Sequence, residues 1–401
     1  MKKYQLNAKS NPYYRTFLGL GLTQLTNIFD TVSDHNKIIP RHLTKGLENI
    51  SYFSLLLGYG AVPTPTTDLF EFFETDDITR LRNDANTILV FDCTFEGDPV
   101  CDLLLVKSLE YSCIKYHINP KKIFLFTGNL KPLEHTTDIN VIPIFVLHTS
   151  FQNINYISLK DAYAQCDQIF HQKMVLSLSR RPRPHRVLAH FMLSNSEIFD
   201  DCLISQCRST VDNCHMFGGN ISSDDLTKME LTFEDWEYFK NRLPFTADGQ
   251  DFEINEPFNC LSRLHFGTLF SIVNETLATN QNGTSLFYSE KFLKPIINFQ
   301  PMLIYGQHNI NKKLSILGFK TYETYFNLDF DDEPDDILRY KKLLTSATDT
   351  VRYLKSLSRD RQIEWRFQQN ELLEFNFHNA LNMPHVITQM SVFLGIVRNN
   401  L

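Results

Sequence analysis

The chain has 401 residues, more than one hydrophobic core usually organises, so we expect two domains. Apolar residues make up 43% of it and charged residues 21%, which excludes a disordered or collagenous chain. The net charge of −7 disfavours binding of the whole protein along a nucleic-acid backbone, although a local basic pocket for a small anion stays possible.

The cysteines and the apolar runs indicate where the protein works. None of the eight cysteines has the paired spacing of a zinc site, and we interpret them as thiols in a reducing compartment. The N-terminal residues lack the apolar run of a signal peptide, and every apolar stretch falls short of the ~20 residues of a membrane helix. These features predict a cytoplasmic protein without a membrane span.

The first half of the chain alternates short apolar runs with one helical pattern, after a poorly patterned stretch over residues 1–85. Thr87–Phe91, Lys122–Thr127 and Asn140–Val146 are short apolar runs typical of strands buried on both faces. Asp102–His117 carries apolar residues at roughly helical spacing. This order predicts a parallel α/β sheet.

The second half repeats that pattern. Lys173–Ser179 predicts a strand, which is followed by a basic loop and by a helix from about Val187 to Leu193. We expect further strands at Leu269–Val273 and Pro301–Tyr305, helices at Lys291–Asn298 and Lys312–Leu317, and mostly helix beyond residue 335.

Two α/β blocks in tandem predict two Rossmann-like domains. We expect an N-terminal α/β domain over residues 1–170, a second α/β domain over residues 171–335, and a helical segment over residues 336–401 that packs on them. Ligands of open α/β sheets bind at the carboxyl ends of the strands, so the residues at those ends are the first candidates for a site.

One such end carries a cluster of arginines. Four arginines lie between Arg180 and Arg186, directly after a predicted strand and before a predicted helix. The guanidinium group presents a rigid fork of donors that matches phosphate oxygens, and a helix start adds unpaired N–H groups. We therefore favour a diphosphate site here over a solvated basic turn.

A second candidate follows the strand that ends in Asn274-Glu275. After a polar loop, Ser289 is placed as the N-cap of a helix, with Glu290 and Lys291 in its first turn. Taken alone, Ser289-Glu290-Lys291 indicates only a helix start with an acid near the positive end of its dipole.

Several motifs in a fixed order resemble a known family. Phe270–Thr321 is similar to the donor-binding half of GT-B glycosyltransferases related to the α1,3-fucosyltransferases, above all their divergent bacterial and viral branch. The resemblance rests on Ser289-Glu290-Lys291, Lys294-Pro295, Gln300-Pro301 and Leu317-Gly318-Phe319-Lys320-Thr321. The segments Ser179–Leu193, Phe91–Gly97 and Phe126-Thr127-Gly128-Asn129 resemble the same branch, so that residues 85–335 are covered.

The resemblance implies two facing Rossmann-like domains and a nucleoside-diphosphate-sugar donor. In the family, the Glu of the Glu-Lys pair binds the ribose hydroxyls of the nucleotide and the Lys binds a phosphate, which implies these roles for Glu290 and Lys291. The arginine at the start of the preceding α/β unit's helix binds the diphosphate in the family, which corresponds to Arg186, or to Arg181 in another register of the loop.

Asn274 and Glu275 are then expected to face the sugar, with Ser289 completing the donor site. The sequence departs here from the family's usual Glu-Asn-Ser, so these two assignments follow the motif less closely than that of the Glu-Lys pair.

An inverting transfer also needs a general base near the acceptor hydroxyl. We expect Glu96 in this role, in the loop after the Thr87–Phe91 strand, with Asp92 and Asp98 as alternatives and a solvated loop acid as the plain interpretation. The acidic run Asp329–Asp336 is predicted to be a solvated loop before a helix, so we expect no metal.

The function expected from these features is transfer of a sugar to an acceptor hydroxyl on a glycan. If the protein is viral, as its Phe- and Asn-rich composition suggests, a hydroxylated DNA base is a second acceptor and the host cytoplasm its location. The alternatives are a non-catalytic α/β binding or assembly protein that retains a nucleotide-binding fold, and a phosphate-ester enzyme that uses the arginine loop.

Overall fold

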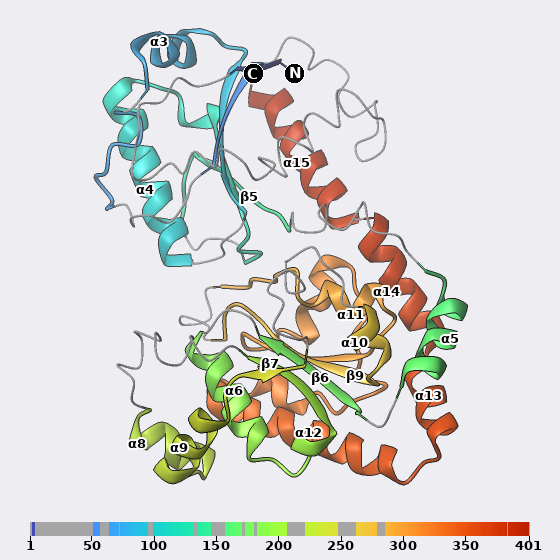
Figure 1. Cartoon of the computed structure of the whole chain (residues 1–401). Coiled ribbons are helices and arrows are strands. Elements are labelled where there is room, and N and C mark those ends of the chain that lie inside the picture. Colours follow the sequence, from blue (N-terminus) through green and yellow to red (C-terminus); the bar gives the residue numbers. More distant parts are fainter. Residues whose placement is uncertain are drawn as a thin grey trace. The chain divides into compact units, whose positions relative to one another are not determined.

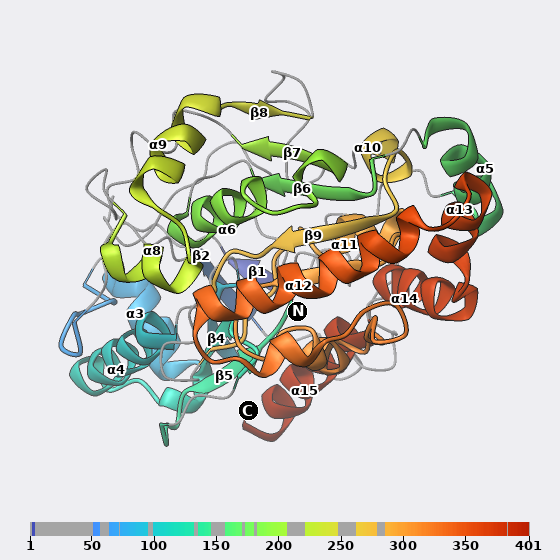
Figure 2. The same ribbon diagram turned by 90° about the horizontal axis from the view of Figure 1, so that it is seen from below.

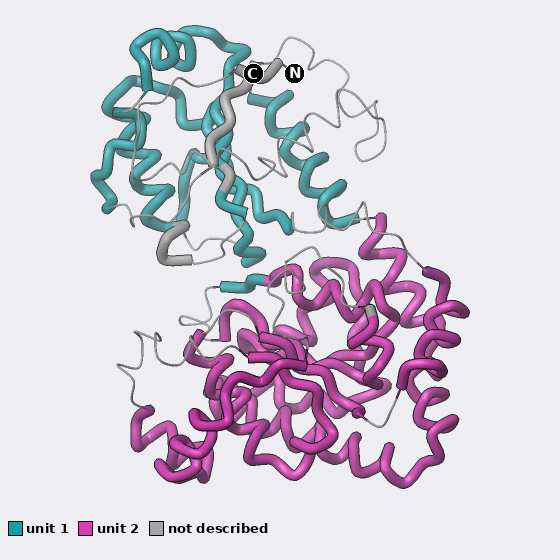
Figure 3. Tube along the Cα trace, viewed as in Figure 1, with its two compact units in different colours: residues 1–150, 281–287, 383–401 teal, residues 151–280, 288–382 magenta. Residues whose placement is uncertain are grey.

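The computed structural model describes thirteen stretches of the chain, which form two compact units (Figure 3). Unit 1 contains residues 1–150, 281–287 and 383–401, and unit 2 contains residues 151–280 and 288–382. The described residues are 2–4, 51–56, 64–71, 73–94, 99–131, 135–145, 157–170, 173–179, 183–206, 221–247, 262–278, 285–382 and 384–400.

Unit 1 is built on a parallel sheet with the order β1-β2-β3-β4-β5. Its strands are β1 (Lys2–Tyr4), β2 (Ser51–Leu56), β3 (Thr87–Cys93), β4 (Ile123–Thr127) and β5 (Asn140–Pro143). The helices are α3 (Thr75–Asn83), α4 (Pro99–Tyr116), the short 3₁₀ helix η1 (Pro120–Lys122) and α15 (Pro384–Asn400). The strands predicted from Thr87, Lys122 and Asn140 and the helix between them are confirmed, with β5 ending earlier than expected, at Pro143.

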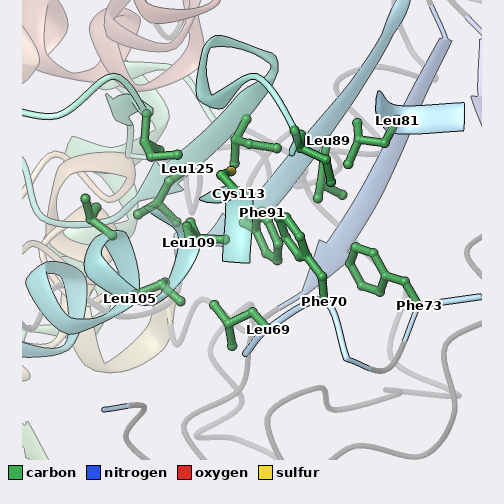
Figure 4. Close-up of a cluster of buried hydrophobic side chains, with 14 of the residues drawn as sticks. Leu69, Phe70, Phe73, Leu81, Leu89, Phe91, Leu105, Leu109, Cys113 and Leu125 are labelled. Carbon is green, nitrogen blue, oxygen red and sulfur yellow. The ribbon is translucent and has the colours of Figure 1, made fainter. Parts of the chain in front are cut away.

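Side chains that alternate along the strands of unit 1 divide its core between two faces. On one face, Leu105, Leu109 and Cys113 of α4 belong to a cluster that includes Phe91 and Leu125 of the sheet (Figure 4). On the other face, the ring of Phe393 in α15 lies 4.9 Å from Phe124 and 5.2 Å from Phe126, measured between ring centroids. The last helix of the chain is therefore part of the core of unit 1.

One helical stretch of the described chain, Asn370–Asn400, is long and apolar enough to cross a membrane, judged by length and composition alone. Core helices of soluble proteins pass the same test. This stretch consists of α14 (Asn370–Asn382) and α15, and their rings pack internally. Phe377 stacks on Phe299 at 4.5 Å within unit 2, and Phe393 packs in unit 1, so some of the apolar residues of this stretch are core residues.

Unit 2 contains a five-stranded sheet with the order β10-β9-β6-β7-β8, parallel except for the edge strand β8. The strands are β6 (Val175–Ser179), β7 (Cys202–Gln206), β8 (Phe245–Thr246), β9 (Phe270–Asn274) and β10 (Met302–Tyr305). The chain runs from β6 to β7 on one side and then returns to place β9 on the other side of β6, so the winding direction reverses between β6 and β9.

Helices cover both faces of this second sheet. Because parallel crossovers are right-handed, the reversal puts α6 (Pro184–Ser194) and α11 (Leu293–Ile297) on opposite faces. Helix α12 (Asp336–Lys355) packs with α6, and α14 packs with α11, as Figures 1 and 2 show. The remaining helices of unit 2 are α5 (Leu159–Ile169), η3 (Phe199–Asp201), α8 (Ser223–Met229), α9 (Phe233–Arg242), α10 (Ser262–Phe266), η6 (Lys312–Leu317), η7 (Asp329–Asp332) and α13 (Arg359–Phe367).

The structure confirms two α/β sheets dominated by parallel strands and a helical C-terminal region, and it corrects three details. Strand β7 and the helices α8 and α9 were not predicted. Lys312–Leu317 is a 3₁₀ helix, and α11 begins only at Leu293 with Phe292 as its N-cap. Ser289 is therefore not the N-cap of a helix. Its hydroxyl donates to Glu275 instead.

Two buried arginines tie the C-terminal helices of unit 2 to main-chain carbonyls. Arg366 of α13 donates to the carbonyls of His265, Thr268, Asn298 and Phe299. Arg339 of α12 donates to the carbonyls of Ala278, Gly306, Glu333 and Pro334. Arg366 thus fastens the turns before β9 and β10 to α13, and Arg339 fastens the segments after the same two strands to α12. The polar atoms of both guanidinium groups are satisfied although the side chains are buried.

Arg366→Met should destabilise unit 2 by at least about 3 kcal/mol, because it removes the donors of several buried carbonyl groups. Arg361→Met is the matched control, since Arg361 lies on the same helix with a side chain that is 71% exposed. Urea unfolding of the two variants checks this, and an Arg366 variant as stable as the control would contradict it.

Candidate functional site

The candidate site lies at the carboxyl ends of β6 and β9, where the winding of the sheet reverses. Ser179 ends β6, Asn274 ends β9, and α6 begins at Pro184 just beyond. In open α/β sheets this reversal leaves a crevice outside the strand ends, because the connections diverge to opposite faces. The position is therefore the one at which this architecture usually binds ligands.

A buried carboxylate organises the site. Glu275 follows β9 directly and has no exposed surface. Its Oε2 accepts the hydroxyl of Ser289 at 2.6 Å, the N–H of Ser289 at 3.2 Å and the N–H of Thr276 at 3.0 Å. These three donors offset the cost of burying the charge, and they hold Ser289 beside the end of the strand.

The main chain of Glu275 fixes the start of α6. Its carbonyl oxygen accepts from Nε of Arg186 and from Nε2 of His185, both at 2.9 Å. Since a carbonyl only accepts, His185 carries its proton on Nε2. Burial lowers the pKa of His185 to about 3, and the neighbouring charges of Arg186, Arg183 and Lys291 act in the same direction. His185 is therefore neutral and serves as a fixed donor.

Two cations meet at the hydroxyl of Thr276. The guanidinium of Arg186 donates to this oxygen at 3.1 Å, and the ammonium of Lys291 approaches it at 3.4 Å. Lys291 also donates to Ser289 Oγ at 3.0 Å and to Glu290 Oε1 at 3.1 Å. Both cations are thus held by short-range contacts around Glu275 and Ser289.

The pKa values of the Glu290–Lys291 pair are both lowered. For Lys291 the main cause is burial, to which the charge of Arg186 adds, while Glu290 opposes it. For Glu290 burial alone would raise the pKa, but the charge of Lys291 and its hydrogen bond outweigh this effect. The closeness of Arg186 therefore disfavours the charged form of Lys291, and an anion bound at these cations would relieve that repulsion.

A second polar network lies beneath the strand ends. The Nδ2 of Asn274 lies within hydrogen-bonding distance of Ser177 Oγ (3.1 Å), Ser179 Oγ (3.3 Å) and His190 Nε2 (3.1 Å), and its two hydrogens serve two of these acceptors at a time. His190 Nδ1 then donates to Gln206 Oε1 at 2.5 Å, which ties β9, β6, α6 and β7 together. Sequence reasoning missed Ser177, His190 and Gln206. The available signal was the position of His190, four residues after Arg186 and so on the same face of α6.

The structure brings together, at this edge of unit 2, six of the residues that were predicted to bind the sugar donor. They are Arg186, Asn274, Glu275, Ser289, Glu290 and Lys291. Arg181 and the general-base candidates Glu96 and Asp98 lie outside the residues that the structure describes, and for the third candidate, Asp92, only the backbone is described.

Asn274 and Glu275, which were expected to face the sugar, both have buried side chains. The carboxylate of Glu275 accepts from Ser289 and Thr276, so it supports the site from within the protein. The Nδ2 of Asn274 lies among Ser177, Ser179 and His190, whereas its Oδ1 has no hydrogen-bond partner among the described residues, and its contact with the sugar stays a prediction.

The acidic run Asp329–Asp336 departs from the expected solvated loop at Asp331, which is fully buried and accepts from Asn311 Nδ2 and from the N–H of Lys312. Asp329 and Asp332 are exposed. The helix predicted after the run is confirmed, and Asp335 caps it through the N–H groups of Ile337 and Leu338. Within the described ranges no group of three or more His, Cys, Asp or Glu side chains is arranged to hold a metal ion.

Comparisons with protein-family models, with curated proteins and with solved structures found no match to this chain.

His190 makes unit 2 sensitive to acid. Burial lowers its pKa to about 4, whereas the unfolded residue titrates near 6.5. Below pH 6.5 the unfolded state binds a proton that the native state excludes, so the free energy of unfolding falls between about pH 6.5 and pH 4, by roughly 3 kcal/mol for this residue. His190→Gln keeps a donor and an acceptor but does not titrate. The variant should therefore show a flatter decline in urea unfolding over this range, and parallel curves for the two proteins would contradict the assignment.

Proposed function

We propose that the protein is a nucleotide-sugar-dependent glycosyltransferase of the GT-B type, metal-independent and inverting, with its donor site in unit 2. The observation that carries the proposal is the convergence of Arg186 and Lys291 on Thr276 at the winding reversal of the sheet. Two cations held this close favour an anion with several oxygens, such as a diphosphate.

The leaving group defines what these residues would do. As the bond between the anomeric carbon and the phosphate oxygen breaks, negative charge grows on the nucleoside diphosphate, and fixed cations stabilise it. Arg186 and Lys291 supply the positive charge. Glu290 holds Lys291 through Oε1, and a carboxylate has further acceptor sites for two vicinal ribose hydroxyls.

Glu275 and Ser289 keep these groups in place without touching the donor. The Ser289 hydroxyl donates to Glu275 and accepts from Lys291, so it links the buried carboxylate to the outer cation. Such preorganisation matters because misplacing a stabilising group by about 1 Å lowers the rate steeply.

The acceptor half of the proposal comes from the sequence resemblance. Glu96 would take the proton of the acceptor hydroxyl as the new glycosidic bond forms with inversion, and Asp92 and Asp98 are the alternatives. The acceptor is a hydroxyl of a glycan, or of a modified DNA base if the protein is viral and works in the host cytoplasm.

A panel of GDP, UDP and ADP tests the donor site by thermal shift. One of them should stabilise the protein by about 2.7 kcal/mol at 100 times its Kd. Lys291→Met should weaken nucleotide binding at least about tenfold, because it removes one cation that donates hydrogen bonds to the phosphates. Lys312→Met is the matched control, since Lys312 binds only the surface acid Asp332 through its side chain.

No stabilisation by any nucleotide would overturn the donor site. Binding that survives Lys291→Met would move the site elsewhere. Nucleotide binding without transfer to any acceptor would leave the non-catalytic binding protein as the function.

Glu96→Gln should abolish sugar transfer, because the amide cannot take the acceptor's proton, while donor affinity stays as in the wild type. Transfer assays and nucleotide titrations on the same preparation check both halves. Full activity of this variant would transfer the role to Asp92 or Asp98.

A further inference from the structure

A short segment of unit 1 leads directly into the candidate site of unit 2. Residues 281–287 belong to unit 1, although the chain before and after them belongs to unit 2 (Figure 3). Within this segment both main-chain polar groups of Leu286 form hydrogen bonds. Its N–H donates to Asn129 Oδ1 at 2.9 Å, and its carbonyl accepts the N–H of Leu130 at 2.7 Å.

Asn129 is built to hold this segment. Its side chain is fully buried in the loop after β4, and its Oδ1 also accepts the N–H of Lys131 at 3.1 Å. The N–H of Asn129 in turn donates to Thr127 Oγ1 at 3.0 Å, which fixes the loop against the end of the strand. One amide oxygen therefore joins the loop of unit 1 to Leu286.

The next anchored residue already belongs to unit 2. The hydroxyl of Tyr288 donates to the carbonyl of Ile310 at 2.6 Å, and its buried ring packs 5.2 Å from the ring of Phe292. Ser289 follows at once and is bound by Glu275. Only Phe287 separates the anchor in unit 1 from the first anchor in unit 2.

A link of this length cannot stretch. Consecutive Cα atoms lie 3.8 Å apart, so Leu286 and Tyr288 can be separated by at most about 7 Å. The hydrogen bonds of Leu286 to Asn129 and Leu130 therefore restrict the chain directly before Tyr288 and Ser289, and losing them leaves these two residues without a fixed neighbour on their N-terminal side.

We propose that Asn129 of unit 1 is a positioning residue for Ser289-Glu290-Lys291 of unit 2, acting through the covalent link at residues 286–288. The inference rests on the proposed function only for its consequence, which is that nucleotide affinity depends on the Asn129–Leu286 contact. By linkage, a bound nucleotide then stabilises this contact to the same extent. The proposal assigns a role to Asn129 in the Phe126-Thr127-Gly128-Asn129 motif, whose residues had no predicted role.

Asn129→Leu tests this, because it keeps the size of the side chain and removes the acceptor. Amide hydrogen exchange resolved by NMR should become at least about tenfold faster at Ser289 and Lys291 as well as at Leu286. Asn129→Asp retains an acceptor oxygen and should restore slow exchange. Asn140→Leu is the matched control, since Asn140 donates to the carbonyls of Lys121 and Ile123 at the other end of β4.

The contradicting result is faster exchange at Leu286 alone, with Ser289 and Lys291 unchanged. In the wild-type protein, which needs no substitution, Leu286 and Ser289 should open together under low denaturant with the same dependence on its concentration. Separate opening would also overturn the proposal.

Nucleotide affinity provides an independent arm. If GDP, UDP or ADP binds, Asn129→Leu should raise its Kd about tenfold while Asn140→Leu leaves it unchanged. If none binds to the wild type, the proposed function fails, and the exchange measurements still decide the role of Asn129.

Discussion

The arrangement of the candidate site depends on the burial of one carboxylate, Glu275. A charged group without solvent requires donors on all sides, and the protein supplies them from Ser289 and Thr276, while the carbonyl of the same residue receives Arg186 and His185. The end of β9, the start of α6 and the turn before α11 are therefore fixed by a single residue. Arg186 and Lys291 lie close together at Thr276 because Glu275 fixes these segments.

The parallel strands could be predicted because burial on both faces leaves continuous apolar runs, as in β3, β4 and β10. Strand β7 escaped because Ser205 and Gln206 interrupt its apolar pattern, and the side-chain oxygen of Gln206 accepts from a residue distant in the sequence, His190. Ser289 fits the local rule for an N-cap, but a carboxylate fourteen residues earlier competes for its hydroxyl. No local pattern records such a competition.

For the site, the rule that ligands bind at strand ends pointed to the arginine cluster and to Asn274-Glu275, and the family resemblance was needed to add Glu290 and Lys291. Neither could tell which polar residues point outward, because exposed and buried polar residues look alike in a loop. We therefore expected both Asn274 and Glu275 to face the sugar, whereas both side chains are buried and the carboxylate of Glu275 is bound by Ser289 and Thr276. Knowing that β6 lies between β7 and β9 would have indicated this, since Ser177 and His190 then face Asn274.

The late position of the helices that complete both cores constrains how the protein can be made. In unit 2 the carbonyls of Thr268 and Asn298 receive Arg366, and in unit 1 the rings of Phe124 and Phe126 receive Phe393. These partners leave the ribosome only well after the strands that they cover, so neither unit can finish folding as its own sheet emerges. Each sheet therefore has an incompletely covered apolar face until the helix that packs on it has been synthesised.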